Sequence, residues 1–178
     1  MPSSSPFSIR PATRRDAHKV AELHAQAMRD AGLEAEASGR AQAMSVIERQ
    51  AYWREAIEFS EPQVRVAIEG TGDAAPIVGF VGFDRSRDDG TPPTTGEIWA
   101  LCVVPEHQDK GIGQALCEAA LQGLSDEDCT DATLWLTVDN ERALSFFEQA
   151  GFAREDGSLR AVAGVDGKQE VRLHRALG

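Results

Sequence analysis

A short glycine motif, Gln108-x-x-Gly111-x-Gly113, separates an apolar run over residues 98–104 from a helical pattern over residues 111–124. The apolar run predicts a buried strand, and the proline that follows it cannot continue a central ladder. The glycines therefore fall where a strand passes into a helix. The first N–H groups of a helix lack intrahelical partners and lie at the positive end of its dipole, so this turn predicts a phosphate site.

Two other glycine motifs do not fit the same stretch. It contains no Gly-x-x-x-x-Gly-Lys-Ser/Thr, which a P-loop requires. Leu116 stands where the dinucleotide-binding fingerprint has its third glycine. On the motif alone, a strand-to-helix turn whose glycines serve only the backbone geometry remains the alternative.

Length and composition predict one globular domain. The chain has 178 residues, and its hydrophobic content of 42% suffices for a core. Because the chain has no apolar stretch of about 20 residues and no secretory pattern at its N-terminus, we expect a cytoplasmic protein without a membrane span. We expect a disordered tail over residues 1–6 and a single domain over residues 7–178. No spacing predicts a metal site, and three cysteines are expected to be buried, reduced thiols: Cys102, Cys117 and Cys129.

The formal net charge of −11 bears on the partners of the protein. No basic block offsets it, so nucleic acid is not expected to bind. Such a charge attracts cationic ligands, amines among them, at long range. An acidic surface that serves only solubility explains the same number.

Hydrophobic periodicity predicts the remaining elements of the chain. A helix follows the capping box Thr13-x-x-Asp16 and ends near Gly32, and another ends at Gly151. A loop or a frayed helix is expected over residues 33–40, and a loop over residues 85–95. The helix that ends at Gly151 spans 140–150. The other predicted elements are strands over 7–10, 63–68, 77–83 and 132–138, a helix over 41–59, and a C-terminal hairpin of arms 152–163 and 169–177 that turns at Asp166-Gly167.

The order of these elements, βααβββαβαββ, limits the fold. The succession of strand 98–104, helix 111–124 and strand 133–138 implies a parallel pair joined by a crossover. The hairpins on either side of it are antiparallel. The sequence therefore predicts an α/β (α+β) fold, in which a mixed sheet carries helices on its faces.

A second motif lies downstream, Asn140-x-x-Ala143-x-x-Phe146-Phe147-x-x-x-Gly151-Phe152. In this order and at this spacing, the two motifs resemble the GCN5-related N-acetyltransferase (GNAT) family. The resemblance covers nearly the whole chain. It implies a mostly antiparallel sheet of about seven strands with a central, splayed parallel pair, flanked by about four helices. It also implies acyl transfer from acetyl-CoA to a primary amine of a small molecule or peptide, without a metal.

The resemblance also implies where acetyl-CoA binds. The pantetheine arm would lie between the splayed strands and bond to the main chain like an added strand. The glycine loop would hold the pyrophosphate through its N–H groups, and Lys110 adds charge there unless it is only solvated. Asn140 would lie beside the CoA arm, or serve as the N-cap of its helix, or both. The implied cofactor residues are Leu101, Cys102, Val103, Val104, Gln108, Asp109, Lys110, Gly111, Ile112, Gly113, Gln114, Asn140 and Phe147.

Glu97 is the candidate general base, because some members of the family place a catalytic glutamate at this position. With strict strand alternation, Glu97, Trp99, Leu101 and Val103 share one face. A carboxylate there could take the proton of the amine through a water molecule, and a backbone N–H near Val103 could bind the oxyanion. A glutamate at a frayed strand start is the alternative. Glu34 and Glu36 could instead line the substrate entrance.

Phe147 departs from the family pattern, which has a tyrosine there as general acid. Two outcomes follow: the thiolate leaves without that acid, or the domain binds acyl-CoA without turning it over. A thiol pKa of about 8.5 makes the first acceptable. Tyr52 is expected to serve the core rather than replace the acid, and Cys102 to be a small buried residue rather than a nucleophile. Members of this family often dimerise, so a homodimer is possible.

Overall fold

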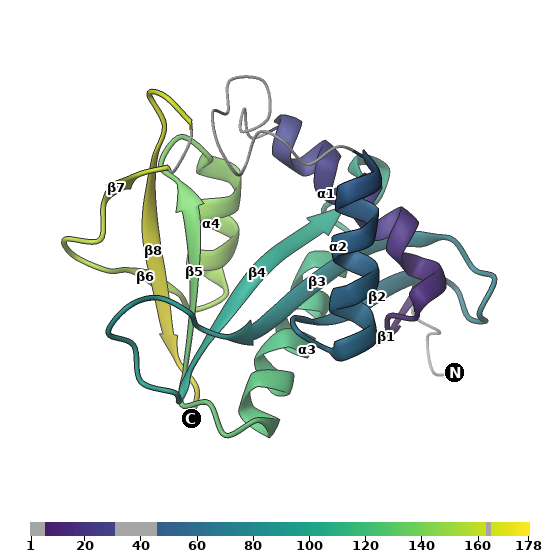
Figure 1. Cartoon of the computed structure of the whole chain (residues 1–178), viewed down its shortest axis with the longest axis horizontal. Helices are drawn as coiled ribbons and strands as arrows, with labels where there is room; N and C mark the ends of the chain where they lie inside the picture. The colour runs from purple at the N-terminus through teal and green to yellow at the C-terminus, as the bar shows by residue number, and fades with distance from the viewer. Residues whose placement is uncertain (1–5, 31–45, 163–164) are drawn as a thin grey trace.

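The structure is a computed structural model that describes residues 6–30, 46–162 and 165–178 (Figure 1). The described helices are α1 (Ala17–Asp30), α2 (Val46–Phe59), α3 (Ile112–Asp126) and α4 (Glu141–Gln149), with single 3-10 turns at Arg14–Asp16 and Pro105–His107. The strands are β1 (Phe7–Pro11), β2 (Gln63–Glu69), β3 (Ile77–Arg85), β4 (Thr95–Val103), β5 (Asp131–Thr137), β6 (Ala153–Arg154), β7 (Arg160–Ala161) and β8 (Gln169–Ala176).

One eight-stranded sheet runs through the protein in the order β1-β2-β3-β4-β5-β8-β6, with β7 also paired to β8. All neighbours are antiparallel except β4 and β5, which are parallel. Helix α3 connects this parallel pair. The mixed, mostly antiparallel sheet with a central parallel pair and flanking helices is therefore confirmed.

Helices cover the sheet on both faces, and each face has its own core. On the face that we call the α3 face, α3 and α4 pack on residues such as Phe83, Leu134 and Leu173. On the opposite α1 face, α1 and α2 lie over β2–β4, and Trp53 and Phe80 fill the core (Figure 1). Burial of these apolar side chains at about 25 cal/mol per Å² is the main source of stability on both faces.

Alternation along β5 and β8 also assigns their residues to faces. Ala132, Leu134 and Leu173 belong to the core of the α3 face. The intervening Thr133, Trp135 and Arg172 therefore point to the α1 face, as the sequence pattern of β5 predicts. On that face, the 86–94 loop contacts Trp135 and Arg172, and residues 155–160 line a cavity with them.

A β-bulge at Trp99 corrects one prediction about β4. Gly82 of β3 pairs with Ala100, but Phe83 pairs with Ile98, so Trp99 is an extra residue on β4. Ile98 consequently packs in the same core as Leu101 and Val103, on the α3 face. Glu97 points the other way, onto the α1 face, beside its partner Asp84. The prediction that Glu97 shares a face with Leu101 and Val103 is wrong, because strict alternation does not hold through a bulge.

The helix starts follow the predicted capping chemistry. The Asp16 carboxylate accepts a hydrogen bond from the Thr13 N–H at 2.7 Å and pairs with Arg10 at 2.7 Å. Burial opposes ionisation of Asp16, but the hydrogen bonds from Arg10 and Thr13 outweigh it and lower the Asp16 pKa. At the start of α4, the Asn140 Oδ1 accepts from the Ala143 N–H at 3.3 Å. The predicted N-cap role of Asn140 is thus confirmed.

Two predicted elements differ from the observed ones. The first arm of the C-terminal hairpin is split into β6 and β7, because Gly157 (φ 74°) turns the chain between them. Strand β4 begins at Thr95, three residues earlier than predicted, where Gly96 packs directly against Leu124 of α3. The predicted loop over 33–40, the start of the helix predicted over 41–59 and all but the last residue of the predicted 1–6 tail lie outside the described residues.

Candidate active site

The glycine loop opens α3 as the motif predicts. Gly111 is the N-cap of the helix and has φ 83°, a left-handed conformation that glycine adopts without strain. The first intrahelical hydrogen bond runs from the Ala115 N–H to the Gly111 carbonyl at 3.0 Å. The N–H groups of Ile112, Gly113 and Gln114 precede that bond, so they are available to an anion at the positive end of the helix.

Close packing holds the loop between β4 and α4. A Cβ on Gly113 would lie 3.3 Å from the Phe146 ring, which is tighter than ordinary contact. The Gln108 Nε2 donates to the Val103 carbonyl at 3.2 Å, and this bond ties the loop to the end of β4. The Gln108 N–H is itself bonded to the Pro105 carbonyl. The loop N–H groups predicted to bind phosphate therefore begin after Gln108.

The parallel pair splays, as the resemblance implies. β4 and β5 pair only from Thr95↔Asp131 to Glu97↔Thr133, and beyond this point they are not paired. The β4 edge that faces β5 is therefore open from the bulge to the glycine loop. An extended ligand could enter this edge as an added strand.

Main-chain directions divide the four predicted pantetheine residues into two pairs. The Val104 N–H donates to the Val78 carbonyl at 2.9 Å and thus faces β3. Groups on alternate residues of an antiparallel strand point to the same edge, so Cys102 also faces β3. Leu101 and Val103 turn their N–H and C=O groups to the open edge. The Val103 carbonyl also accepts from Gln108, which leaves its N–H as the available donor.

Residues of α4 border the other side of the splay. Phe147 is 5% exposed and packs edge-to-face against Phe146 and Phe152, with ring centroids 5.0 and 5.6 Å away. Arg142 reaches across to the glycine loop, where its Nη2 lies 3.2 Å from the Asp109 carboxylate. Lys110, next to Asp109, is exposed. Two cationic side chains thus lie at the glycine loop: Lys110 from the loop itself and Arg142 from α4. The sequence motif indicated only Lys110.

Glu97 is half-buried on the α1 face, at the last paired position before β4 and β5 separate. Burial raises the pKa of its carboxyl to about 7, with a further contribution from the negative charge of Asp88, while Arg160 and Arg172 oppose the shift. A carboxyl with this pKa exchanges a proton readily at neutral pH. By contrast, burial raises the pKa of the Cys102 thiol to about 12, so Cys102 is no thiolate nucleophile.

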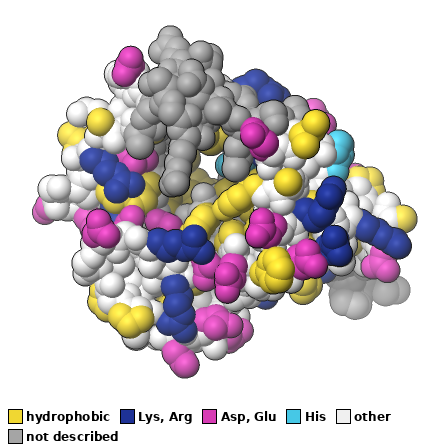
Figure 2. Space-filling view, in the orientation of Figure 1, with side chains coloured by type: hydrophobic (Ala, Val, Ile, Leu, Met, Phe, Trp, Pro, Cys, Tyr) yellow, Lys and Arg dark blue, Asp and Glu magenta, His cyan; other side chains and the backbone are white. Residues whose placement is uncertain are grey.

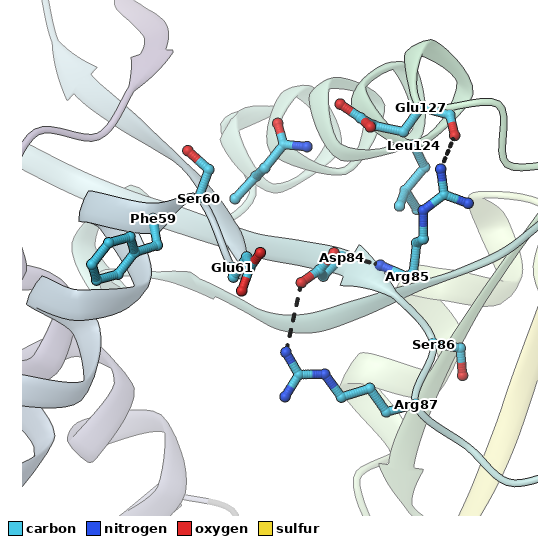
Figure 3. A pocket seen from close by; sticks show the side chains of 10 residues that line it. Phe59, Ser60, Glu61, Asp84, Arg85, Ser86, Arg87, Leu124 and Glu127 are labelled. Carbon is cyan, nitrogen blue, oxygen red and sulfur yellow. Dashed lines mark hydrogen bonds and ion pairs between the residues drawn. The ribbon is translucent and has the colours of Figure 1, made fainter. Parts of the chain in front are cut away.

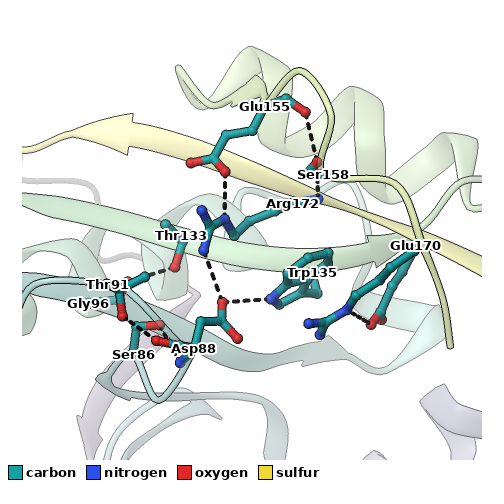
Figure 4. A network of polar contacts seen from close by, with 11 residues as sticks. Ser86, Asp88, Thr91, Gly96, Thr133, Trp135, Glu155, Ser158, Glu170 and Arg172 are labelled. Atoms are coloured by element: carbon teal, nitrogen blue, oxygen red, sulfur yellow. Dashed lines mark hydrogen bonds and ion pairs between the residues drawn. The ribbon is translucent and has the colours of Figure 1, made fainter. Parts of the chain in front are cut away.

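A polar network on the α1 face joins the 86–94 loop to β5 and β8 (Figure 4). The Asp88 carboxylate accepts from the Trp135 Nε1 at 2.9 Å and from the Arg172 Nη1 at 3.2 Å. The Arg172 Nε donates to Glu155 at 2.6 Å. The Arg160 guanidinium lies over the Trp135 ring, 3.4 Å from its centroid. Sequence reasoning did not find this network, because its members are brought together only by the sheet.

Two of the cavities among the described residues bear on the location of the site. The larger, about 600 Å³, lies among Asp84, Arg85, Arg87, Leu124 and Glu127 (Figure 3). It adjoins the C-terminal end of α3, and 15 residues at about 1.5 Å each put it roughly 20 Å from the glycine loop, so it is not the phosphate site. The smaller, about 440 Å³, lies over Trp135.

Comparison with known proteins decides the family. A model of the acetyltransferase (GNAT) family matches residues 20–152. The chain belongs to this family. The match includes both motifs, the splayed strands and Glu97.

Curated relatives of this GNAT chain are acetyltransferases of about three to four times the matched length. It is 30% identical to the mycothiol acetyltransferase of Kocuria rhizophila over 101 residues, which are 57% of this chain and 33% of that protein. It is 36% identical to the mycothiol acetyltransferase of Pseudarthrobacter chlorophenolicus over 80 residues, 45% of this chain and 25% of that protein. The chain thus spans about a third or less of the length of these relatives.

Solved structures confirm the fold over almost the whole chain. The yncA protein of Salmonella typhimurium, determined with its cofactor acetyl-CoA, matches with a TM-score of 0.73 at 19% identity, covering 97% of this chain and 94% of that one. Ard1 of Thermoplasma volcanium matches with a TM-score of 0.74 at 17% identity, covering 97% and 99%. The GNAT fold expected from the motifs is therefore confirmed.

The structure gathers most of the predicted residues around one splay. The glycine loop, the open edge of β4, Asn140 and Glu97 surround it, whereas Phe147 lies in the core beside it. Tyr52 is half-buried against Trp53 on the α1 face, as a core residue is. Glu34 and Glu36 lie outside the described residues. Among the described residues, no group of His, Cys, Asp and Glu side chains could hold a metal ion, and no helix is long and apolar enough to cross a bilayer.

Proposed function

We propose that this GNAT chain is an N-acetyltransferase that moves the acetyl group of acetyl-CoA to a primary amine of a small molecule or peptide. One observation carries the proposal. The open edge of β4 leads from the start of α3, which suits an anion, to the point where β4 and β5 separate. At that point lies the half-buried carboxyl of Glu97, whose pKa is raised to about 7. Acetyl-CoA fits this path, because its pyrophosphate suits the helix start and its amide-bearing arm suits an open strand edge.

Residues of this chain would hold the donor in three places. The N–H groups of Ile112, Gly113 and Gln114 face the pyrophosphate, and Lys110 and Arg142 add positive charge nearby. The N–H and C=O groups of Leu101 and the C=O group of Val103 bond to the pantetheine amides, so the Val103 N–H stays available for the oxyanion. The thioester at the end of the pantetheine arm then lies in the splay, where Glu97 approaches it from the α1 face.

The transfer needs a neutral amine, because an ammonium has no lone pair. The amine approaches from the α1 face and gives a proton to the Glu97 carboxylate, through a water molecule. Its nitrogen forms a bond to the thioester carbon, and the Val103 N–H donates to the oxyanion that results. When the tetrahedral species collapses, the C–S bond breaks and CoA leaves as a thiolate. The nitrogen loses its second proton to water, and this proton balances the one that the thiolate takes up.

The thiolate takes its proton from water in this proposal. Phe147 has no acidic proton to donate, and its ring is buried in the core. General-acid assistance contributes about 10² to 10⁴ in rate, so its absence slows the reaction without preventing it. The alternative function is a domain that binds acyl-CoA without turnover, and the buried Phe147 is the observation that favours it.

Release of free thiol from acetyl-CoA in the presence of a panel of primary amines tests the two functions. The proposal expects amine-dependent release of CoA and a stoichiometric acetylated amine by mass spectrometry. Isothermal titration with CoA is the parallel measurement. Tight CoA binding without thiol release on any amine would establish the binding domain instead, and no heat with CoA would contradict both functions.

A further inference from the structure

The cavity over Trp135 lies next to the proposed acceptor position, on the same face of the sheet. Glu97 pairs with Thr133, and Trp135 lies two residues further along β5, about 7 Å at 3.3 Å per residue. Thr133 and Trp135 both point to the α1 face. The 440 Å³ of the cavity is within the range of about 300–1,000 Å³ typical of small-molecule sites.

The charges that line this cavity favour a cation. Four carboxylates, those of Asp88, Asp89, Glu155 and Asp156, line it together with two guanidinium groups. Both guanidinium groups are already paired: Arg172 with Asp88 and Glu155, and Arg160 with Glu170. Neither is therefore available to hold an anionic ligand. These pairs also engage Asp88 and Glu155, so Asp89 and Asp156 supply the excess negative charge that attracts a cation.

The Trp135 ring shows which kind of cation fits. Its face carries the Arg160 guanidinium at 3.4 Å, and its Nε1 donates to Asp88, which fixes the ring plane. An indole face is the best aromatic surface for a cation. The Arg160 side chain is 50% exposed and comes from a strand of two residues, so a ligand cation can take its place.

We propose that this cavity binds a second cationic group of the acceptor, so that the preferred substrate is a diamine rather than a monoamine. The inference rests on the proposed function. One amino group lies at Glu97 and is acetylated, and the other stays charged over Trp135 beside Asp88. The roughly 7 Å between Thr133 and Trp135 is a span that a chain of about four to five carbons between two amino groups covers.

Binding to the protein with CoA bound tests the subsite without turnover, since CoA carries no acetyl group. Isothermal titration compares cadaverine with n-pentylamine, which has the same chain and one amino group fewer. We expect cadaverine to bind about tenfold more tightly. Trp135→Ala and Asp88→Asn should each reduce this preference, whereas Trp135→Phe keeps an aromatic face and should retain part of it.

Arg160→Ala gives an effect of opposite sign. Removing the competing guanidinium should raise the affinity for cadaverine about two- to threefold. Arg154→Ala is the matched control, because Arg154 pairs with Glu148 on the surface away from the cavity and should leave the affinity unchanged. Weaker cadaverine binding in Arg160→Ala would show that Arg160 helps to hold the ligand, and would overturn the proposal.

The same two amines separate the subsite from the reaction. Equal affinity for cadaverine and n-pentylamine would reject the subsite. A preference for cadaverine that survives in both Trp135→Ala and Asp88→Asn would also reject it. Circular dichroism checks that both variants are folded. Acetylation of both amines with equal kcat/KM would reject the subsite and leave the transferase. Selective cadaverine binding without acetylation would reject the transferase and leave the subsite.

Discussion

The two sides of the splay between β4 and β5 are built by different means. On the α3 face, the glycine loop and α4 are held by apolar packing and by main-chain bonds, as at Gly113 against Phe146. On the α1 face, Glu97 is surrounded by charged side chains from the 86–94 loop, β7 and β8. Figure 2 shows that acidic and basic side chains are interspersed over this face of the molecule. The first side depends on backbone geometry, and the second depends on the identities of individual side chains.

This difference separates the roles of the two sides. In the proposed function, acetyl-CoA is bound by helix N–H groups and a strand edge, which any sequence that folds this way provides. An acceptor is selected by side chains, which vary without changing the fold. Substitutions on the α3 face should therefore change CoA binding, and those on the α1 face should change turnover and acceptor choice.

Glu97→Gln should have the largest effect. Glutamine keeps the shape of the side chain but cannot take a proton, so kcat should fall about 10²- to 10⁴-fold while the Kd of CoA stays the same. Steady-state thiol release and isothermal titration measure the two quantities. Glu118→Gln, an exposed position on α3, is the control and should change neither. Unchanged turnover in Glu97→Gln would reject Glu97 as the base.

The pH profile gives the next largest effect. The Glu97 pKa is raised from 4.5 to about 7, so the carboxylate that accepts the proton predominates only above pH 7. The kcat/KM should therefore fall about tenfold per pH unit as the pH decreases below 7. Glu97→Gln should lose this limb. A limb that persists in the variant would belong to another group.

The parts that the sequence predicted are those with a local pattern. Strand alternation identified the faces of β5, and the motif spacing located the turn at Gly111 and the cap at Asn140. Two features had no local signal. The bulge at Trp99 depends on the pairing with β3, and the contact between Asp88 and Arg172 joins positions 84 residues apart. The role of Glu97 as base stays a prediction, and the face to which its side chain points required the register of the neighbouring strand β3.

Gly111→Val should weaken CoA binding about tenfold. Valine at φ 83° is strained by about 1–2 kcal/mol, and the loop can relieve this strain only by moving the N–H groups at the start of α3. Gly70→Val is a matched control, because Gly70 has φ 82° and no atom within 4 Å of an added Cβ, but lies in the turn between β2 and β3. Isothermal titration with CoA should show the loss only in Gly111→Val. Equal losses in both variants would mean that global destabilisation, not the loop, causes them.

Arg142→Ala should have the smallest effect on the α3 face. The Arg142 side chain is 65% exposed and its partner Asp109 is 90% exposed, so their ion pair is screened by solvent and adds little to stability. Its loss should weaken CoA binding less than about fivefold, and the effect should shrink further as salt is raised. Because Arg142 touches neither Glu97 nor the cavity over Trp135, kcat and the preference for cadaverine should not change. A change in acceptor preference would contradict the separation of the two faces, since it would place an α4 side chain in the selection of the amine.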